Sequence, residues 1–201
     1  MESNLETIIV IVFVIGSLVL AYVIGLFNQR RIMSAWGEVA NRTGLQLEQQ
    51  TTLGIPRGHL VGHYRGSPAL METYTVGSGR HRRTYTRVVI QINNRVNGKL
   101  AIYQETIFSQ LGKALGMQDI QTGDEELDKR FILKGQPENF ALSVLNSVNL
   151  RQALLQTRAP NVHLEGNSLR HSEQGVVTDP ERTQAVLELL SQIAEGVERA
   201  G

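Results

Sequence analysis

Four arginines within eight positions are the residues with the clearest capacity for chemistry. In GSGRHRRTYTR, residues 77–87, the arginines are Arg80, Arg82, Arg83 and Arg87, and His81 lies among them. Guanidinium groups bind carboxylates and phosphates through paired N–H donors. The two glycines in front predict an exposed turn, and the stretch holds no acid to pair with its arginines. These five residues are therefore the candidate binding surface for an anionic partner.

Three uses of this turn stay open. A charged turn can serve only to keep a hairpin soluble and its edges unpaired. Near a bilayer it can bind anionic lipid headgroups, to which each basic residue close to the surface contributes about 1 kcal/mol. It can also bind an acidic protein surface. Nucleic acid is a weaker candidate, because the aromatic content is only 5% and no nucleic-acid-binding motif accompanies the arginines.

Two histidines and an acidic run are the other candidates, and neither has the spacing of a metal site. His59 and His63 lie in a strand-like pattern, where a spacing of four places them far apart along one face. No glutamate completes an H-E-x-x-H motif. The run GDEELD, residues 123–128, lacks the ligand spacing of an EF-hand and indicates a solvated loop or a helix start. We predict no metal site and no cofactor.

The sequence also lacks the common catalytic motifs. GSGR has neither the P-loop lysine nor the third glycine of a dinucleotide-binding loop, and there is no G-x-S-x-G elbow and no cysteine. His163 and His171 fall on an expected hairpin, where we predict surface residues. We therefore expect a non-catalytic binding or scaffold domain. A membrane-bound hydrolase or ligand-modifying enzyme is the alternative, which a pocket of clustered titratable groups would favour.

An uncharged apolar segment sets the location of these residues. Residues 7–27 carry no charge and are long enough to cross a bilayer. A cleaved signal peptide is disfavoured, because the N-terminus carries Glu2 and Glu6 rather than basic residues. We predict a six-residue tail, a transmembrane helix over residues 7–29, and one soluble domain over residues 30–201, with a possible subdivision near residue 105.

Charge sets the expected orientation. Arg30 and Arg31 close the apolar segment, and no basic residue precedes it, so the positive-inside rule places residues 30–201 in the cytoplasm, anchored to the inner membrane. An outward-facing domain with an envelope role is the alternative. Residues 30–99 hold eleven Lys or Arg against three acids, whereas residues 100–201 hold nine against fourteen. This asymmetry suggests that one half faces an anionic surface.

Periodicity predicts an α+β domain with a mainly antiparallel sheet packed by helices. An apolar stripe over residues 32–40 predicts a helix that continues the membrane helix or docks on the domain. Strands are expected over 45–52, on either side of the turn 65–68, over 84–93 and after Asn97-Gly98, a typical hairpin pair. The remaining expectations are helices over 105–116, 137–146 and 149–158, a strand over 129–135, a hairpin turning at Gly166-Asn167, and a long C-terminal amphipathic helix over 178–199.

Three segments carry a resemblance to a protein family. They are W..VA..TGL.LE after the apolar segment, RGHLVGHYRGSPALMETYTVGSG..RTYTRV, and QDIQTGDEELDKRFILKGQPENFALSVLN. With them the chain resembles uncharacterised bacterial single-pass membrane proteins. The resemblance implies a bacterial origin, a single anchor and one soluble domain of unknown function. It implies no catalytic residue.

Overall fold

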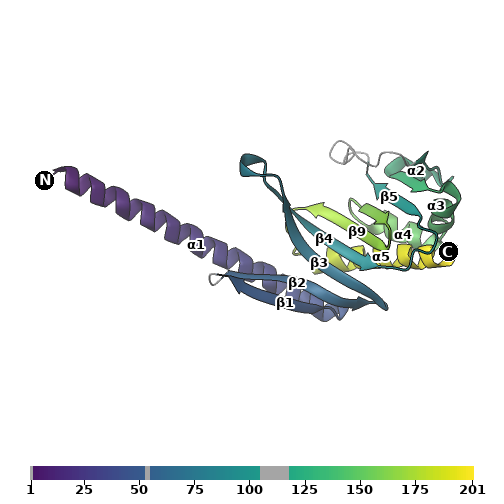
Figure 1. Cartoon of the computed structure of the whole chain (residues 1–201), viewed down its shortest axis with the longest axis horizontal. Coiled ribbons are helices and arrows are strands. Elements are labelled where there is room, and N and C mark those ends of the chain that lie inside the picture. The colour runs from purple at the N-terminus through teal and green to yellow at the C-terminus, as the bar shows by residue number, and fades with distance from the viewer. Residues whose placement is uncertain (1, 53–54, 105–117) are drawn as a thin grey trace.

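The first element is one unbroken helix whose N-terminal half projects from the rest of the protein. The computed structural model describes residues 2–52, 55–104 and 118–201, and α1 (Glu2–Thr43) is 42 residues long, about 63 Å at the usual helical rise. Its large apolar side chains from Ile8 to Phe27, other than the partly exposed Leu26, are exposed, and Figure 1 shows this half extending away from the rest of the chain. With a mean hydropathy of 2.9 over its most apolar window, α1 is long and apolar enough to cross a membrane.

The second half of α1 belongs to the core of the domain. The predicted stripe is buried, with Trp36 and Val39 each only 1% exposed, and it packs against β2 (Ile55–Tyr64) and α5 (Pro180–Ala200). The indole Nε1 of Trp36 donates a hydrogen bond to the Val177 carbonyl oxygen over 2.8 Å. Both expectations for this segment hold, because the helix is continuous and also docks.

The strands form one antiparallel sheet. In the described residues it has nine strands in the order β1-β2-β3-β4-β9-β8-β5-β7-β6. Besides β2, the strands are β1 (Gln46–Thr52), β3 (Ser67–Val76), β4 (Arg83–Gln91), β5 (Lys99–Tyr103), β6 (Gln118–Asp119), β7 (Ile132–Gln136), β8 (Asn161–Glu165) and β9 (Ser168–Gln174). Every pair of neighbours is antiparallel.

A row of directly paired residues crosses seven strands and shows where the core lies. Each member pairs with the next and is at most 4% exposed: Leu60, Met71, Val88, His171, Val162, Ile102 and Leu133. Paired residues share a sheet face, so a single apolar face runs from β2 to β7. The sheet is therefore continuous through strands from both sides of residue 105.

Helices cover this apolar face. Besides α1 and α5, they are α2 (Glu125–Arg130), α3 (Glu138–Leu145) and α4 (Val148–Gln156). α5 packs on β4 and β9 and also contacts α1, α3 and α4, and Figure 1 shows it running behind the sheet. Asp179 caps α5 by accepting hydrogen bonds from the backbone N–H groups of Glu181 and Arg182. The predicted α+β class and the long C-terminal helix are confirmed.

The expected hairpin at Asn97-Gly98 is wrong. β4 and β5 are not neighbours, because the β8–β9 hairpin lies between them. The buried side chain of Asn94 instead joins this connection to the β8–β9 turn, donating to the carbonyl oxygens of Gly98 and Gly166 over 2.8 Å each. The turn at Gly166-Asn167 is confirmed. The expected helix over 105–116 lies outside the described residues.

His171 is a second correction. It was expected at the surface, yet it is 2% exposed, and its Nδ1 accepts a hydrogen bond from the Asn161 backbone N–H over 3.3 Å. His163 is also partly buried, and its imidazole stacks on the Tyr103 ring. Desolvation lowers the pKa of His163 below its ordinary 6.5, and nearby Arg170 acts in the same direction. Both histidines are therefore parts of the packed sheet.

Candidate functional site

The connection between β3 and β4 carries the predicted basic residues. We call residues 77–83 the basic turn; it contains a short 3-10 helix over Gly79–His81. The turn closes through hydrogen bonds from the His81 N–H to the Ser78 oxygen and from the Arg82 N–H to the Gly79 oxygen. Gly77 has φ 83°, and a Cβ there would lie 2.5 Å from the His81 carbonyl oxygen. Only glycine fits this position without strain.

Three arginines of the basic turn are exposed and unpaired. Arg80, Arg82 and Arg83 are all solvent-exposed, as is His81. Within the described ranges, no ion pair joins any of the three arginines to an acid. Their guanidinium groups are therefore available to an external anion.

Arg87 is different from the other predicted residues. It lies within β4 opposite Glu72, is only partly exposed, and forms an ion pair with that carboxylate. Its guanidinium carbon lies 5.1 Å from the centre of the Tyr74 ring, which stacks on Tyr85. The stretch itself holds no acid, but Arg87 is paired with an acid on the neighbouring strand, so it differs from the three unpaired arginines.

Two hairpins diverge beside the basic turn. Pairing between β2 and β3 ends at Leu60 and Met71. β2 nevertheless stays paired with β1 as far as Ile55, and β3 stays paired with β4 as far as Val76. A gap therefore separates residues 57–59 from residues 72–75. We call it the fork, and Figure 1 shows it opening toward the side on which the apolar half of α1 extends.

The fork is a cleft of 520 Å³ whose floor is α1. The largely buried side chains of Ile32, Met33 and Trp36 line it, and Asn28 and Gln29 line the end nearest the apolar segment. A Cβ on Gly58 would lie 2.9 Å from the sulfur of Met33, so glycine lets β2 approach the helix closely. The volume is within the range of small-molecule sites, about 300–1,000 Å³.

The walls of the fork are polar and basic. They are formed by residues of both hairpins: Arg57, Gly58, His59, Glu72, Thr73, Tyr74, Thr75, Arg82 and Thr84, with Val176 beside them. Two of these groups are already paired, because His59 Nε2 lies 3.2 Å from a Glu48 carboxylate oxygen and Glu72 binds Arg87. Arg82 belongs to both the basic turn and the fork. It therefore joins the predicted surface to the cleft that Asn28 and Gln29 also line.

Arg30 and Arg31 lie on α1 directly after Gln29, and both are exposed. They lie one helical turn beyond the last exposed apolar residue, Phe27. The predicted membrane-flanking pair and the basic turn are thus both near the point where the helix enters the domain. Sequence analysis did not identify Arg57, Thr73, Thr75 or Thr84 as site residues. Thr73 and Thr75 lie two and four residues after buried Met71, on the same face of the strand, and their polarity there was the signal that could have found them.

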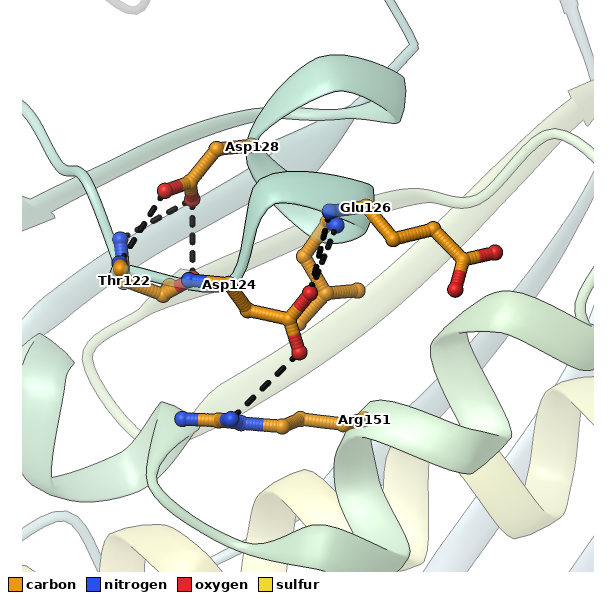
Figure 2. A network of polar contacts seen from close by, with 7 residues as sticks. Thr122, Asp124, Glu126, Asp128 and Arg151 are labelled. Atoms are coloured by element: carbon orange, nitrogen blue, oxygen red, sulfur yellow. Dashed lines mark hydrogen bonds and ion pairs between the residues drawn. The ribbon is translucent and has the colours of Figure 1, made fainter.

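The acidic run at residues 123–128 serves as a helix cap. Figure 2 shows one oxygen of Asp124 accepting the backbone N–H groups of Glu126 and Leu127 at the start of α2, while the other meets Arg151 at 3.4 Å. Asp128 accepts from the backbone N–H and hydroxyl of Thr122. These carboxylates are held by donors of the protein itself, as the expectation of a helix start requires.

A tyrosine and a lysine on neighbouring strands are the groups most similar to a catalytic pair. Lys134 Nζ lies 3.0 Å from an Asp119 oxygen, and this hydrogen bond raises the pKa of Lys134. Burial raises the pKa of Tyr103. Both groups therefore keep their protons at neutral pH and are not suited to act as a base. In the part of the chain that the structure describes, no cluster of three or more His, Asp or Glu could hold a metal.

Comparison with known proteins gives a fold relationship. No family model and no curated protein matches the sequence. The chain is similar in structure to the mycobacterial trehalose monomycolate transport factor A, TtfA, with a TM-score of 0.56 at 10% sequence identity. The match covers 85% of this chain and 96% of the TtfA chain. At this identity the likeness shows a shared fold.

Proposed function

We propose that the chain is a single-pass membrane protein whose non-catalytic domain binds the anionic surface of its own membrane through the basic turn. The observation that carries this proposal is the position of Arg82. It is exposed, has no ion pair within the described residues, and lines the same cleft as Asn28 and Gln29. Those residues directly follow the apolar segment and would lie at the depth of the lipid headgroups when residues 7–27 span the bilayer.

The energetics support docking of an anchored domain. Each basic residue close to an anionic leaflet contributes about 1 kcal/mol, so Arg80, Arg82 and Arg83 contribute about 3 kcal/mol. Because α1 holds the domain at the bilayer, no translational entropy is lost when the turn docks. The arginines would therefore fix the tilt of the domain rather than recruit it.

Orientation and the structural likeness agree with this role. Arg30 and Arg31 would place the domain on the cytoplasmic side of the inner membrane, where the surface potential is negative. TtfA is named as a transport factor, which supports a non-catalytic, membrane-associated role for a domain of this fold. An acidic protein surface is the competing partner, and the following experiment separates the two.

The absence of cysteine allows one probe to be placed at the basic turn. A Ser78→Cys variant of the full chain would be labelled with a fluorophore and reconstituted in nanodiscs whose headgroups carry a quencher. Ser143→Cys on α3, also exposed, is the matched control. We expect quenching at Ser78 in discs containing phosphatidylglycerol, and not in phosphatidylcholine alone. Salt of about 1 M, where the Debye length is about 3 Å, should abolish it.

The matched charge variant replaces Arg80, Arg82 and Arg83 by glutamine. It should lose the quenching at Ser78 while its circular dichroism spectrum stays unchanged, because these side chains make no ion pair in the described structure. Equal quenching in neutral and anionic discs, or quenching that survives the triple substitution, would contradict docking on anionic lipid. No quenching in any disc would also contradict lipid docking and would favour an acidic protein surface as the partner of the arginines.

A further inference from the structure

We propose that the fork is a binding site for the phosphate-bearing headgroup of a single anionic lipid. This inference rests on the proposed function, since it requires the fork to lie at the membrane surface. It goes further, because it assigns a specific site with a defined stoichiometry beside the diffuse attraction of the basic turn. Four features of the fork lead to it.

The first feature is a change of chemistry on one face of the sheet. Met71 and Val88 are paired and buried under the helices. Two residues further along β3, on the same face, Thr73 is exposed, and Thr75 follows it opposite Thr84. The core face of the hairpin thus becomes a row of hydroxyls where the helices no longer cover it. Hydroxyl groups donate hydrogen bonds to phosphate oxygens without adding charge.

The second feature is a pair of arginines facing the fork from separate hairpins. Arg57 comes from β2, and Arg82 comes from the basic turn, directly before β4 begins. Both are exposed, and neither has an ion pair in the residues that the structure describes. The only carboxylate among the lining residues named above belongs to Glu72, and Arg87 already neutralises it. An anion between the hairpins would therefore meet two guanidinium groups and no free carboxylate.

The third feature is access from the bilayer. Asn28 and Gln29 line the fork, and the preceding side chains Ile24 and Phe27 are 59% and 68% exposed on α1. A lipid beside the helix could thus keep its acyl chains against this apolar surface while its headgroup enters the fork. A soluble phosphate would gain nothing from that surface.

The fourth feature is the volume of the cleft. At 520 Å³ it holds more than an isolated phosphate ion requires, and its floor includes the apolar side chains of Ile32 and Met33. A glycerol backbone attached to the phosphate would occupy the remaining volume. Size, charge and access therefore favour one lipid molecule over a free anion.

The sole tryptophan of the chain gives a direct assay. Trp36 lines the fork, so its fluorescence should change when the site fills. The full chain in phosphatidylcholine nanodiscs would be titrated with short-chain phosphatidylglycerol, with short-chain phosphatidylcholine, and with inorganic phosphate. We expect a saturable change with phosphatidylglycerol at one molecule per chain. Phosphatidylcholine should give none, and inorganic phosphate should require at least about a hundredfold higher concentration, because it lacks the apolar contacts.

Variants separate the fork from the basic turn. Arg57→Gln removes a charge-assisted hydrogen bond to the headgroup and should weaken phosphatidylglycerol binding by at least about tenfold. Thr73→Phe fills the cleft and should weaken it similarly, while Thr51→Phe, at an exposed position on β1, is the control for an added aromatic ring. Arg80→Gln with Arg83→Gln, outside the fork, should lower quenching at Ser78 and leave the Trp36 titration unchanged.

Each contrary result has a definite meaning. An absent or non-saturable Trp36 response to phosphatidylglycerol overturns the site, as does an equal response to phosphatidylcholine. Equal affinity for inorganic phosphate would make it a phosphate site with no lipid role. If Thr73→Phe fails to fold, Arg57→Gln decides, because an exposed unpaired arginine is not needed for folding. Quenching at Ser78 without a fork response would leave the proposed function intact and refute only this inference.

Discussion

The hydroxyl of Thr86 should stabilise the joint between the β3–β4 hairpin and α1. Thr86 is 2% exposed. Its Oγ1 donates to the Gly175 carbonyl oxygen and accepts from the Val177 N–H, both over 2.9 Å. The Val177 carbonyl in turn accepts the indole N–H of Trp36. One side chain thus connects β4, through the segment after β9, to α1. We predict that Thr86→Val disrupts this connection.

The expected size of the effect follows from the groups left behind. Valine keeps the shape of threonine but leaves the Gly175 carbonyl and the Val177 N–H without their partner. An unsatisfied buried group costs about 1–3 kcal/mol. Both groups here are only partly buried, so each should cost about 1–2 kcal/mol, and Thr86→Val should lower the free energy of unfolding by about 2–4 kcal/mol in total. Thr86→Ser keeps the hydroxyl and loses one buried methyl group, at a cost of about 1 kcal/mol.

Trp36 fluorescence measures this difference in the full chain. Because it is the sole tryptophan, its signal reports unfolding around the joint without labelling. In urea titrations of the chain in detergent micelles, Thr86→Val should lower the midpoint by about 1–2 M, and Thr86→Ser by clearly less. A valine variant as stable as the serine variant would refute the reasoning, because the hydroxyl would then contribute nothing beyond its volume.

Two further predictions concern the packing around Gly135 on β7 and the protonation of His163 on β8. A Cβ on Gly135 would overlap the side chain of Ala141 on α3, so Gly135→Ala should destabilise the fold by about 1–3 kcal/mol; adding Ala141→Gly should recover part of the loss in urea titrations, and no recovery would contradict the clash. Burial lowers the pKa of His163 below 6.5, so the unfolded chain takes up this proton first as the pH falls. The free energy of unfolding should therefore decrease as the pH falls below 6.5, and less in His163→Gln. Identical pH profiles would contradict this.

Much of the fold could be predicted because its signals are local. The uncharged run before Asn28 and the amphipathic pattern over residues 178–199 each lie within one element, as does the turn at Gly166-Asn167. The exposure of Arg80, Arg82 and Arg83 followed from two glycines and a cluster of like charges. Each of these inferences needs only a short window of sequence, and the structure agrees with all of them.

The outcomes at Asn97-Gly98, at Arg87 and at the fork depend on strand pairing, which a short window does not contain. Asn97-Gly98 has the chemistry of a hairpin turn, yet no local residue indicates that β8 and β9 will insert between the flanking strands. Arg87 lacks a neighbouring acid in sequence, but the register places Glu72 directly opposite it. The fork was missed for the same reason, because it exists only where the pairing of β2 with β3 ends before either strand does.

Because α1 is continuous, the fork and the basic turn have a fixed orientation relative to the apolar segment. A flexible linker after the membrane segment would let the domain take any orientation, and a basic turn would then meet the bilayer only part of the time. Here the helix passes without a break from exposed Phe27 to buried Trp36. Its rotation about its own axis is therefore set by the packing of Ile32, Met33 and Trp36. Under the proposed function, that packing would direct the fork toward the bilayer, and core residues would determine which surface of the domain meets lipid.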